Sequence, residues 1–284
     1  MEIKGSMVVV KQTTVDEVAE AAAARIPAAA GERWGGGWVR LVSLVVVLGA
    51  WELYGRYLLS PVVFTYPTAI ARAFAQLTVS GELAAAAGQS FLVLFAGWLA
   101  GIVVGIPVGL VMARYRLVER SLDTYVNALY ATPAVALVPL IINWFGFTDL
   151  ARMVIVFLFA VFPILINTFQ GVRNVEPSLI EVAKSFCSTE SRLWGDVVLP
   201  SAVPYIVAGL RLAIGRALVG LVVAELFTAI AGFGGIIERS TSAIRYDRMM
   251  VPVVILMFIG VGLTEGLKVL ERRLAPWSAA RRGR

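Results

Sequence analysis

Three long stretches of this chain carry no charged residue, and they constrain its fold more than any other feature. They cover residues 83–113, 124–148 and 153–172. A helix of about 20 mostly apolar residues is long enough to cross the hydrocarbon core of a bilayer. With 59% hydrophobic and 15% charged residues, the chain is also unlike a water-soluble domain. The sequence therefore predicts an all-α integral membrane protein.

Three further stretches predict membrane spans that tolerate a few charges. Residues 41–59 contain Glu52 and Arg56, which stand four residues apart and can pair on one helix face. Residues 249–270 reach full length if Lys268 extends its amine to the interface. Residues 206–230 carry charges within the span. The total is six transmembrane helices.

The positions of the basic residues predict the orientation. Of 25 lysines and arginines, 18 fall in the N-terminal segment, in the loops after spans 2 and 4, or at the C-terminus. Cytoplasmic segments carry this excess, so we expect both termini to be cytoplasmic. The basic character then reflects membrane topology, and no nucleic-acid partner is expected. We divide the chain into a cytoplasmic segment (1–37), which lacks a signal-peptide pattern, a six-helix membrane domain (38–276) and a basic tail (277–284).

Missing residue types exclude several kinds of chemistry. The chain has no histidine and one cysteine, Cys187. Ser-His-Asp triads, Cys/His zinc sites and internal disulfides are therefore excluded. No lysine follows a phosphate-binding glycine loop, and the glycines of residues 231–235 are interpreted as a turn. We expect no enzyme activity, metal or cofactor on this chain.

The second span carries a glycine at every fourth position. These residues are Gly97, Gly101, Gly105 and Gly109. A stripe without side chains lets another helix approach to backbone contact. The partner is either a helix of the same chain, which we favour, or a second subunit.

Polar and charged residues inside the spans indicate a pathway or buried helix contacts. The third span contains Asn127, Thr132 and Asn143, together with two prolines. The fifth contains Arg216 and Glu225, which lie too far apart to pair along one helix. Such groups avoid lipid and seek protein or water. Two interpretations remain open for these charges. The first, which we favour, is that each forms a structural ion pair; the second is contact with a permeating solute.

The loop between spans 4 and 5 predicts two short helices, at residues 177–186 and about 190–198, the second ending at Leu199-Pro200. Glu181 and Lys184 lie on one face of the first helix, while Leu179, Val182 or Ala183, and Phe186 lie on the apolar face. Such an element is suited to dock into a groove on a partner protein.

The segment EVAKSFCSTESRLWGDVVLPSAVP, residues 181–204, resembles the EAA loop of ABC importer permeases. Glu181 and Ala183 match the start of that motif, and Leu199-Pro200 match its end. The segments ATPAVALVPLIINWFG (131–146), FPILINTFQGVRNVEP (162–177) and GLRLAIGRALVGLVVAEL (209–226) are similar to the nitrate, sulfonate and taurine branch. Cys187 departs from the pattern because it occupies the position of the loop glycine. If that position needs a positive φ, the cysteine is strained there.

The resemblance implies a type I importer permease in the bacterial inner membrane. Its partners would be a second permease subunit, favoured to be identical, two cytoplasmic ATPase subunits that bind ATP and magnesium, and an extracytoplasmic binding protein. The loop of about 174–204 would couple to the ATPase. Sulfonates, nitrate, taurine and vitamin precursors are the implied solutes. A self-contained carrier or channel is the alternative; a membrane enzyme is disfavoured because the spans hold no clustered nucleophile, acid and base.

Overall fold

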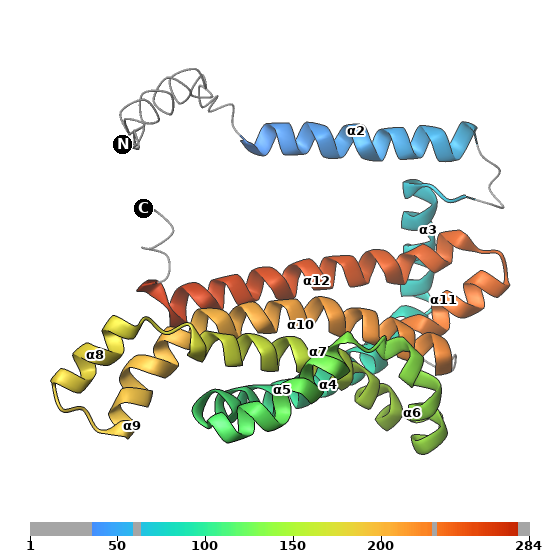
Figure 1. Cartoon of the computed structure of the whole chain (residues 1–284). Coiled ribbons are helices and arrows are strands. Elements are labelled where there is room, and N and C mark those ends of the chain that lie inside the picture. Colours follow the sequence, from blue (N-terminus) through green and yellow to red (C-terminus); the bar gives the residue numbers. More distant parts are fainter. Residues whose placement is uncertain (1–35, 59–63, 229–231, 278–284) are drawn as a thin grey trace, which may run out of the picture. The chain divides into compact units, whose positions relative to one another are not determined.

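The computed structural model describes residues 36–58, 64–228 and 232–277, and all regular structure among them is helical. The chain forms two compact units, Met1–Leu53 and Tyr54–Arg284. The predictions for residues 1–35 and 278–284 lie outside the described residues. The elements are α2 (Gly36–Tyr57), α3 (Pro67–Val79), α4 (Glu82–Arg114), α5 (Arg116–Ala131), η1 (Ala134–Leu137), α6 (Val138–Phe145), α7 (Asp149–Arg173), α8 (Pro177–Ser185), α9 (Glu190–Arg192), η2 (Leu193–Val198), α10 (Leu199–Thr228), α11 (Gly232–Ser242) and α12 (Tyr246–Leu274) (Figure 1).

Five helical stretches in the described residues are long and apolar enough to cross a membrane. They are α2, α4, α7, the continuous helix Glu190–Thr228, and α12. A sixth span is obtained if the bent pair α5 and α6 is counted as one. The predicted all-helical membrane fold is confirmed, with five or six candidate spans.

The predicted third span, 124–148, is broken into two helices. The chain bends by 89° between Arg116–Ala131 and Ala134–Phe145. Thr132 is extended, with ψ 132°, and Pro133 has ψ 96°. The residue before a proline disfavours the helical region, so the helix ends at Ala131. The expected loop after span 2 is also reduced to Tyr115, because α5 begins at Arg116.

Helix α7 packs against both α4 and α10 and forms the centre of the larger unit. The four glycines of α4 lie on the α7 side. A Cβ atom added at Gly97 would lie 2.7 Å from the carbonyl oxygen of Met153, and one added at Gly109 would lie 2.7 Å from that of Leu165. The stripe therefore serves packing within this chain.

Two short helices that we did not expect, α3 and α11, lie at the end of the larger unit opposite α8 (Figure 1). Glu82, at the start of α4, joins α11 and α12 there. Its carboxylate pairs with Arg239 at 3.1 Å and with Arg248 at 2.9 Å. These ion pairs fix the ends of three helices relative to one another.

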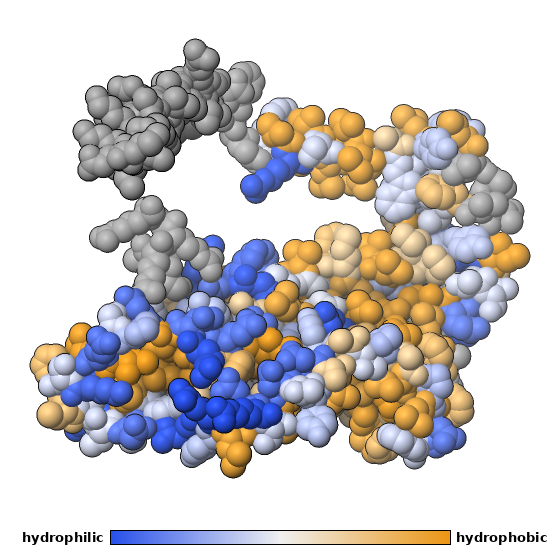
Figure 2. Space-filling view, in the orientation of Figure 1, coloured by the Kyte–Doolittle hydropathy of each residue, from blue (hydrophilic) through white to orange (hydrophobic). Residues whose placement is uncertain are grey.

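Polar and apolar surfaces are segregated along the molecule. Figure 2 shows hydrophilic residues gathered around α5, α8 and α9, and hydrophobic residues along α12. In α2, Val45, Val46 and Val47 are all exposed. Exposed apolar side chains of this density suit contact with acyl chains.

Candidate coupling loop and intramembrane polar sites

Helix α8 presents a row of apolar side chains that the rest of the chain leaves uncovered. Leu179 is 39% exposed, Val182 54% and Phe186 82%. Their spacing of three and four residues places them on one helix face. Glu181 and Lys184 are exposed on the other side of the helix. The helix therefore offers an apolar stripe and, away from it, one acidic and one basic group.

The side of α8 next to Leu179 is anchored to the chain. Ile180 and Ala183 pack against the buried cluster of Val175, Leu193 and Val198. Ala183, which we expected on the apolar docking face, is therefore turned toward its own chain.

A salt bridge ties the second half of the loop to the end of α4. Arg114 contacts the Glu190 carboxylate at 3.2 Å, and its guanidinium lies 5.0 Å from the Trp194 ring centroid. These two contacts join α9 and η2 to the last turn of α4.

Cys187 adopts the left-handed backbone conformation that usually requires glycine, with φ 52°. It ends α8 in a Schellman motif: its N–H donates to the Lys184 carbonyl at 2.9 Å, and the Ser188 N–H donates to the Ala183 carbonyl at 3.1 Å. A cysteine in this conformation costs about 1 kcal/mol relative to glycine. The turn keeps the geometry of a glycine turn although the glycine is missing.

The prediction that the second loop helix ends at Leu199-Pro200 is wrong. Thr189 caps α9, and the helix continues through the π-helical η2 into α10. Pro200 lies inside this continuous helix, directly after the π-helical η2, and its missing N–H removes one backbone hydrogen bond there. The second half of the loop is thereby continuous with a membrane span.

Glu225 is completely buried and is held by hydrogen bonds rather than by an ion pair among the described residues. Ser90 of α4 donates its hydroxyl to one carboxylate oxygen at 2.6 Å, and the N–H of Gly234 donates to the other at 2.7 Å. The expected ion pair is therefore replaced by two neutral donors. Its burial also leaves Glu225 no surface on which to meet a solute in this structure.

The glycines that we interpreted as a turn instead begin α11. Gly232 has φ 74°, and its N–H donates to Gln89 at 3.1 Å. The N–H of Phe233 donates to Ser90 at 2.8 Å. The positive end of the α11 dipole thus meets an anionic and polar site. The signal that could have found it is the adjacent polar pair Gln89-Ser90 in an otherwise apolar span.

Arg216 lies in the middle of α10 and its side chain is exposed in the single chain. Its guanidinium donates to the Tyr130 hydroxyl at 2.9 Å and lies 4.5 Å from the centroid of that ring. Arg216 lines a cavity of about 200 Å³, and Thr132 lines the same cavity. The structure therefore brings together Arg216 and Thr132.

The two asparagines of the sequence prediction are not among the residues that line this cavity. Asn127 is exposed on α5 and Asn143 is exposed on α6. Tyr130, which lies between Asn127 and the Thr132-Pro133 break, was missed by the sequence analysis. Its position before a proline-induced break was the available signal.

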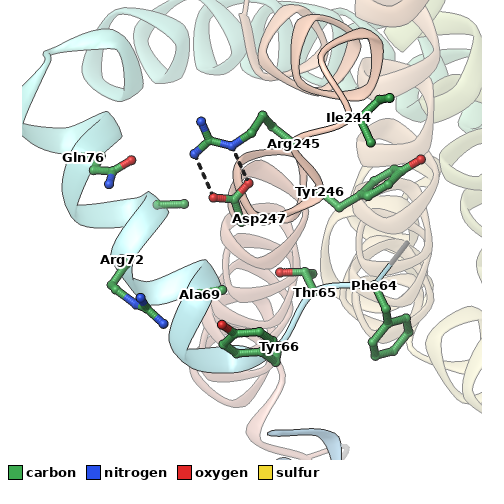
Figure 3. Close-up of a pocket in the computed structure, with 11 residues that line it drawn as sticks. Phe64, Thr65, Tyr66, Ala69, Arg72, Gln76, Ile244, Arg245, Tyr246 and Asp247 are labelled. Carbon is green, nitrogen blue, oxygen red and sulfur yellow. Dashed lines mark hydrogen bonds and ion pairs between the residues drawn. The ribbon is translucent and has the colours of Figure 1, made fainter. Parts of the chain in front are cut away.

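A second cavity, of about 310 Å³, lies at the α3 and α11 end (Figure 3). Arg72 and Gln76 of α3 line it, together with Arg245 and Asp247 from the turn before α12 and its first residues. Arg245 donates to both carboxylate oxygens of Asp247, at 3.0 and 2.9 Å. These hydrogen bonds raise the pKa of Arg245.

Comparison with known proteins places these features in one family. Residues 101–276, more than half of the chain, match the family described as "Binding-protein-dependent transport system inner membrane component". The chain is 32% identical over 243 residues to the "Putative aliphatic sulfonates transport permease protein SsuC" of Bacillus subtilis, covering 85% of this chain and 88% of that protein. It is 30% identical over 204 residues to the "Taurine transport system permease protein TauC" of Escherichia coli, covering 72% and 73%.

A solved structure shares the fold. The chain superposes on the MetNI methionine ABC transporter, in an inward-facing conformation, with a TM-score of 0.53 and 20% identity, covering 66% of this chain and 93% of that one. Permeases of this family are multi-pass inner-membrane proteins without cofactors or catalytic activity of their own. The chain belongs to the binding-protein-dependent transport family and is the membrane-spanning permease subunit of an ABC importer.

Proposed function

We propose that α8 is the element through which a cytoplasmic ATPase drives this permease. The observation that carries the proposal is the uncovered stripe of Leu179, Val182 and Phe186 on a helix that Ile180 and Ala183 anchor to the chain. Apolar side chains on a helix face are typical anchors for a groove on a partner. Glu181 and Lys184 are exposed on the other side of the helix and would make polar contacts with the ATPase.

The proposed direction of coupling follows from the continuity of the loop with the spans. Glu190 is tied to α4 through Arg114, and η2 continues into α10. Closure of two ATPase subunits would pull on α8 and shift α4 and α10 together. The end of the molecule that carries α8, and both termini, would then be cytoplasmic, in agreement with the excess of basic residues in those segments.

The proposed assembly contains two permease subunits, favoured to be identical, two ATPases and an extracytoplasmic binding protein. The surface formed by α5 and the middle of α10 is polar, with Asn127, Thr132 and Arg216, and is uncovered in the single chain. It would line the pathway between two permeases. Asn143 on α6 would lie toward its outer mouth, and the cavity near Arg245 would face the binding protein.

The proposed solute is a small sulfonate, or a related compound such as taurine, nitrate or a vitamin precursor. The support comes from the names of two relatives that share 30 to 32% of their aligned residues with this chain. Among these compounds, the oxyanions, which are the sulfonates and nitrate, are favoured because the surface carries the positive charge of Arg216.

The test is the substitution Phe186→Glu, with Glu181→Lys as a second variant on the same helix. Loss of a central apolar anchor costs about 2 kcal/mol or more, so we expect ATPase association to weaken at least about tenfold. Val79→Glu, at a residue that is 90% exposed in α3, is the matched control.

Co-purification of the ATPase and ATP-dependent uptake into proteoliposomes are measured together. Both should fall for Phe186→Glu and for Glu181→Lys, while membrane insertion and the control remain unchanged. Normal association and uptake in both variants would contradict the coupling role of α8. Concentrative uptake by the permease alone, without an ATPase, would instead support a self-contained carrier.

A further inference from the structure

Arg216 is placed where a positive charge is difficult to accommodate. It lies near the middle of the 30-residue helix α10, on a face that this chain leaves exposed. A guanidinium at this depth is costly in contact with acyl chains. The surface that bears it must therefore face water or another protein.

The charge of Arg216 is also uncompensated among the described residues. Its hydrogen-bonding partner is the neutral Tyr130 hydroxyl, at 2.9 Å, and no ion pair involves it. Arg211, five residues earlier on the same helix, is by contrast paired with the Glu271 carboxylate at 2.5 Å. The two arginines differ in role: Arg211 has a fixed counter-charge and Arg216 has none.

The surroundings of Arg216 form a small, selective cavity. It has a volume of about 200 Å³, and Phe159 and Phe162 line it beside Tyr130 and Thr132. The ring of Tyr130 lies under the guanidinium, with its centroid 4.5 Å away, and limits the orientations that the side chain can take. One edge of the guanidinium is engaged by the hydroxyl, which leaves further N–H groups for a ligand.

We propose that Arg216, positioned by Tyr130, binds the anionic group of the solute in transit and selects small organic oxyanions within the permease itself. A planar guanidinium can donate two parallel hydrogen bonds to a sulfonate or carboxylate. Phe159 and Phe162 accommodate the short apolar part of the solute. This inference rests on the proposed function, because it assigns a role within the same pathway.

The test uses the purified permease with its cognate ATPase in nanodiscs of phosphatidylcholine, without the binding protein. Radiolabelled ethanesulfonate is the probe, and ethyl methyl sulfone, which has a similar shape and no charge, is the neutral comparison. The expected result is saturable binding of ethanesulfonate and none of the sulfone. Arg216→Gln should weaken ethanesulfonate binding at least tenfold, and Arg216→Lys should weaken it less because the charge remains.

Tyr130→Phe tests the positioning role. It keeps the ring under the guanidinium and removes the hydroxyl, so affinity should fall several-fold while the number of sites stays constant. Arg273→Gln, at an exposed arginine near the end of α12, is the control and should bind as the native protein does. Size-exclusion chromatography and binding-protein-stimulated ATP hydrolysis establish that each variant is assembled.

Three results would overturn the inference: no saturable ethanesulfonate binding to the native complex, equal binding of the sulfone, or unchanged binding in Arg216→Gln. A fourth is competition by phosphatidylglycerol added to the nanodiscs, which would make a lipid headgroup the ligand. These failures are distinct from failure of the proposed function, because a complex with stimulated ATP hydrolysis can still lack this anion site. Loss of the ATPase contact would be detected separately, by co-purification of the ATPase with the Phe186→Glu variant.

Discussion

Gly234 donates its backbone N–H to the buried carboxylate of Glu225 at 2.7 Å, across the junction between α10 and α11. Ser90 of α4 completes the site, since its hydroxyl donates to the same carboxylate and accepts the N–H of Phe233. Three helices are therefore joined through one acidic side chain. The glycine is required because α11 approaches α10 closely enough to exclude a side chain at this position.

Gly234→Ala is expected to destabilise the permease strongly. A Cβ atom at this position would lie 2.3 Å from the Cβ of Glu225 and 2.8 Å from its backbone carbonyl carbon, so the helices must separate and the buried carboxylate loses a donor. Leaving a buried polar group unsatisfied costs about 1–3 kcal/mol, in addition to the steric strain. The melting temperature in detergent, measured by tryptophan fluorescence, should fall by several degrees.

The matched control is Gly262→Ala in α12, where nothing lies within 4 Å of the added Cβ. Alanine is favoured over glycine in a helix by about 1 kcal/mol, so this variant should be at least as stable as the native chain. A Gly234→Ala variant as stable as the control would show that α11 is not held by Glu225.

Alanine substitutions along α4 should produce a graded loss of stability. Gly97→Ala and Gly109→Ala each place a Cβ 2.7 Å from a backbone oxygen of α7, which cannot move without shifting the helix. Gly101→Ala meets the Cβ of Ala160 at 3.1 Å and should be milder. Overpacking of this kind costs about 1–3 kcal/mol.

Gly88→Ala, on the same helix, meets nothing within 4 Å and should be neutral or stabilising. Thermal unfolding of the four variants under one set of conditions checks this order. A larger effect at Gly88 than at Gly109 would contradict the assignment of the stripe to α7.

Cys187 provides a direct measurement of the side of the membrane on which the loop lies. It is the single cysteine of the chain, and it is exposed in the turn after α8. A membrane-impermeant maleimide should label it in inside-out vesicles and leave it unmodified in intact spheroplasts. Bound ATPase should slow the labelling, since it would cover the neighbouring Phe186. Labelling from the outer side would reverse the proposed orientation.

The sequence predicted the membrane class and the functional loop because both depend on local patterns. Uncharged stretches of sufficient length indicate spans whatever they pack against, and the spacing of Leu179 and Phe186 places them on one helix face. The resemblance to importer permeases was carried by contiguous motifs and is confirmed by the family match over residues 101–276. Pro133 was expected to bend or loosen its helix, but the uncharged stretch gave no indication that the helix ends there and that the chain turns by 89°.

The sequence by itself determined that the chain is an all-helical membrane protein with stretches long enough to span a bilayer, since hydropathy and helical periodicity are properties of neighbouring residues. It also predicts which loop carries the coupling motif. Only the tertiary structure decided the partners of the buried and charged groups. Glu225 is satisfied by Ser90 and Gly234 rather than by a cation, and Arg216 lies over Tyr130 without an ion pair in the part of the chain that the structure describes. The reason is physical: a charge buried in a span must find a partner, but helix packing decides which distant residue comes within hydrogen-bonding distance.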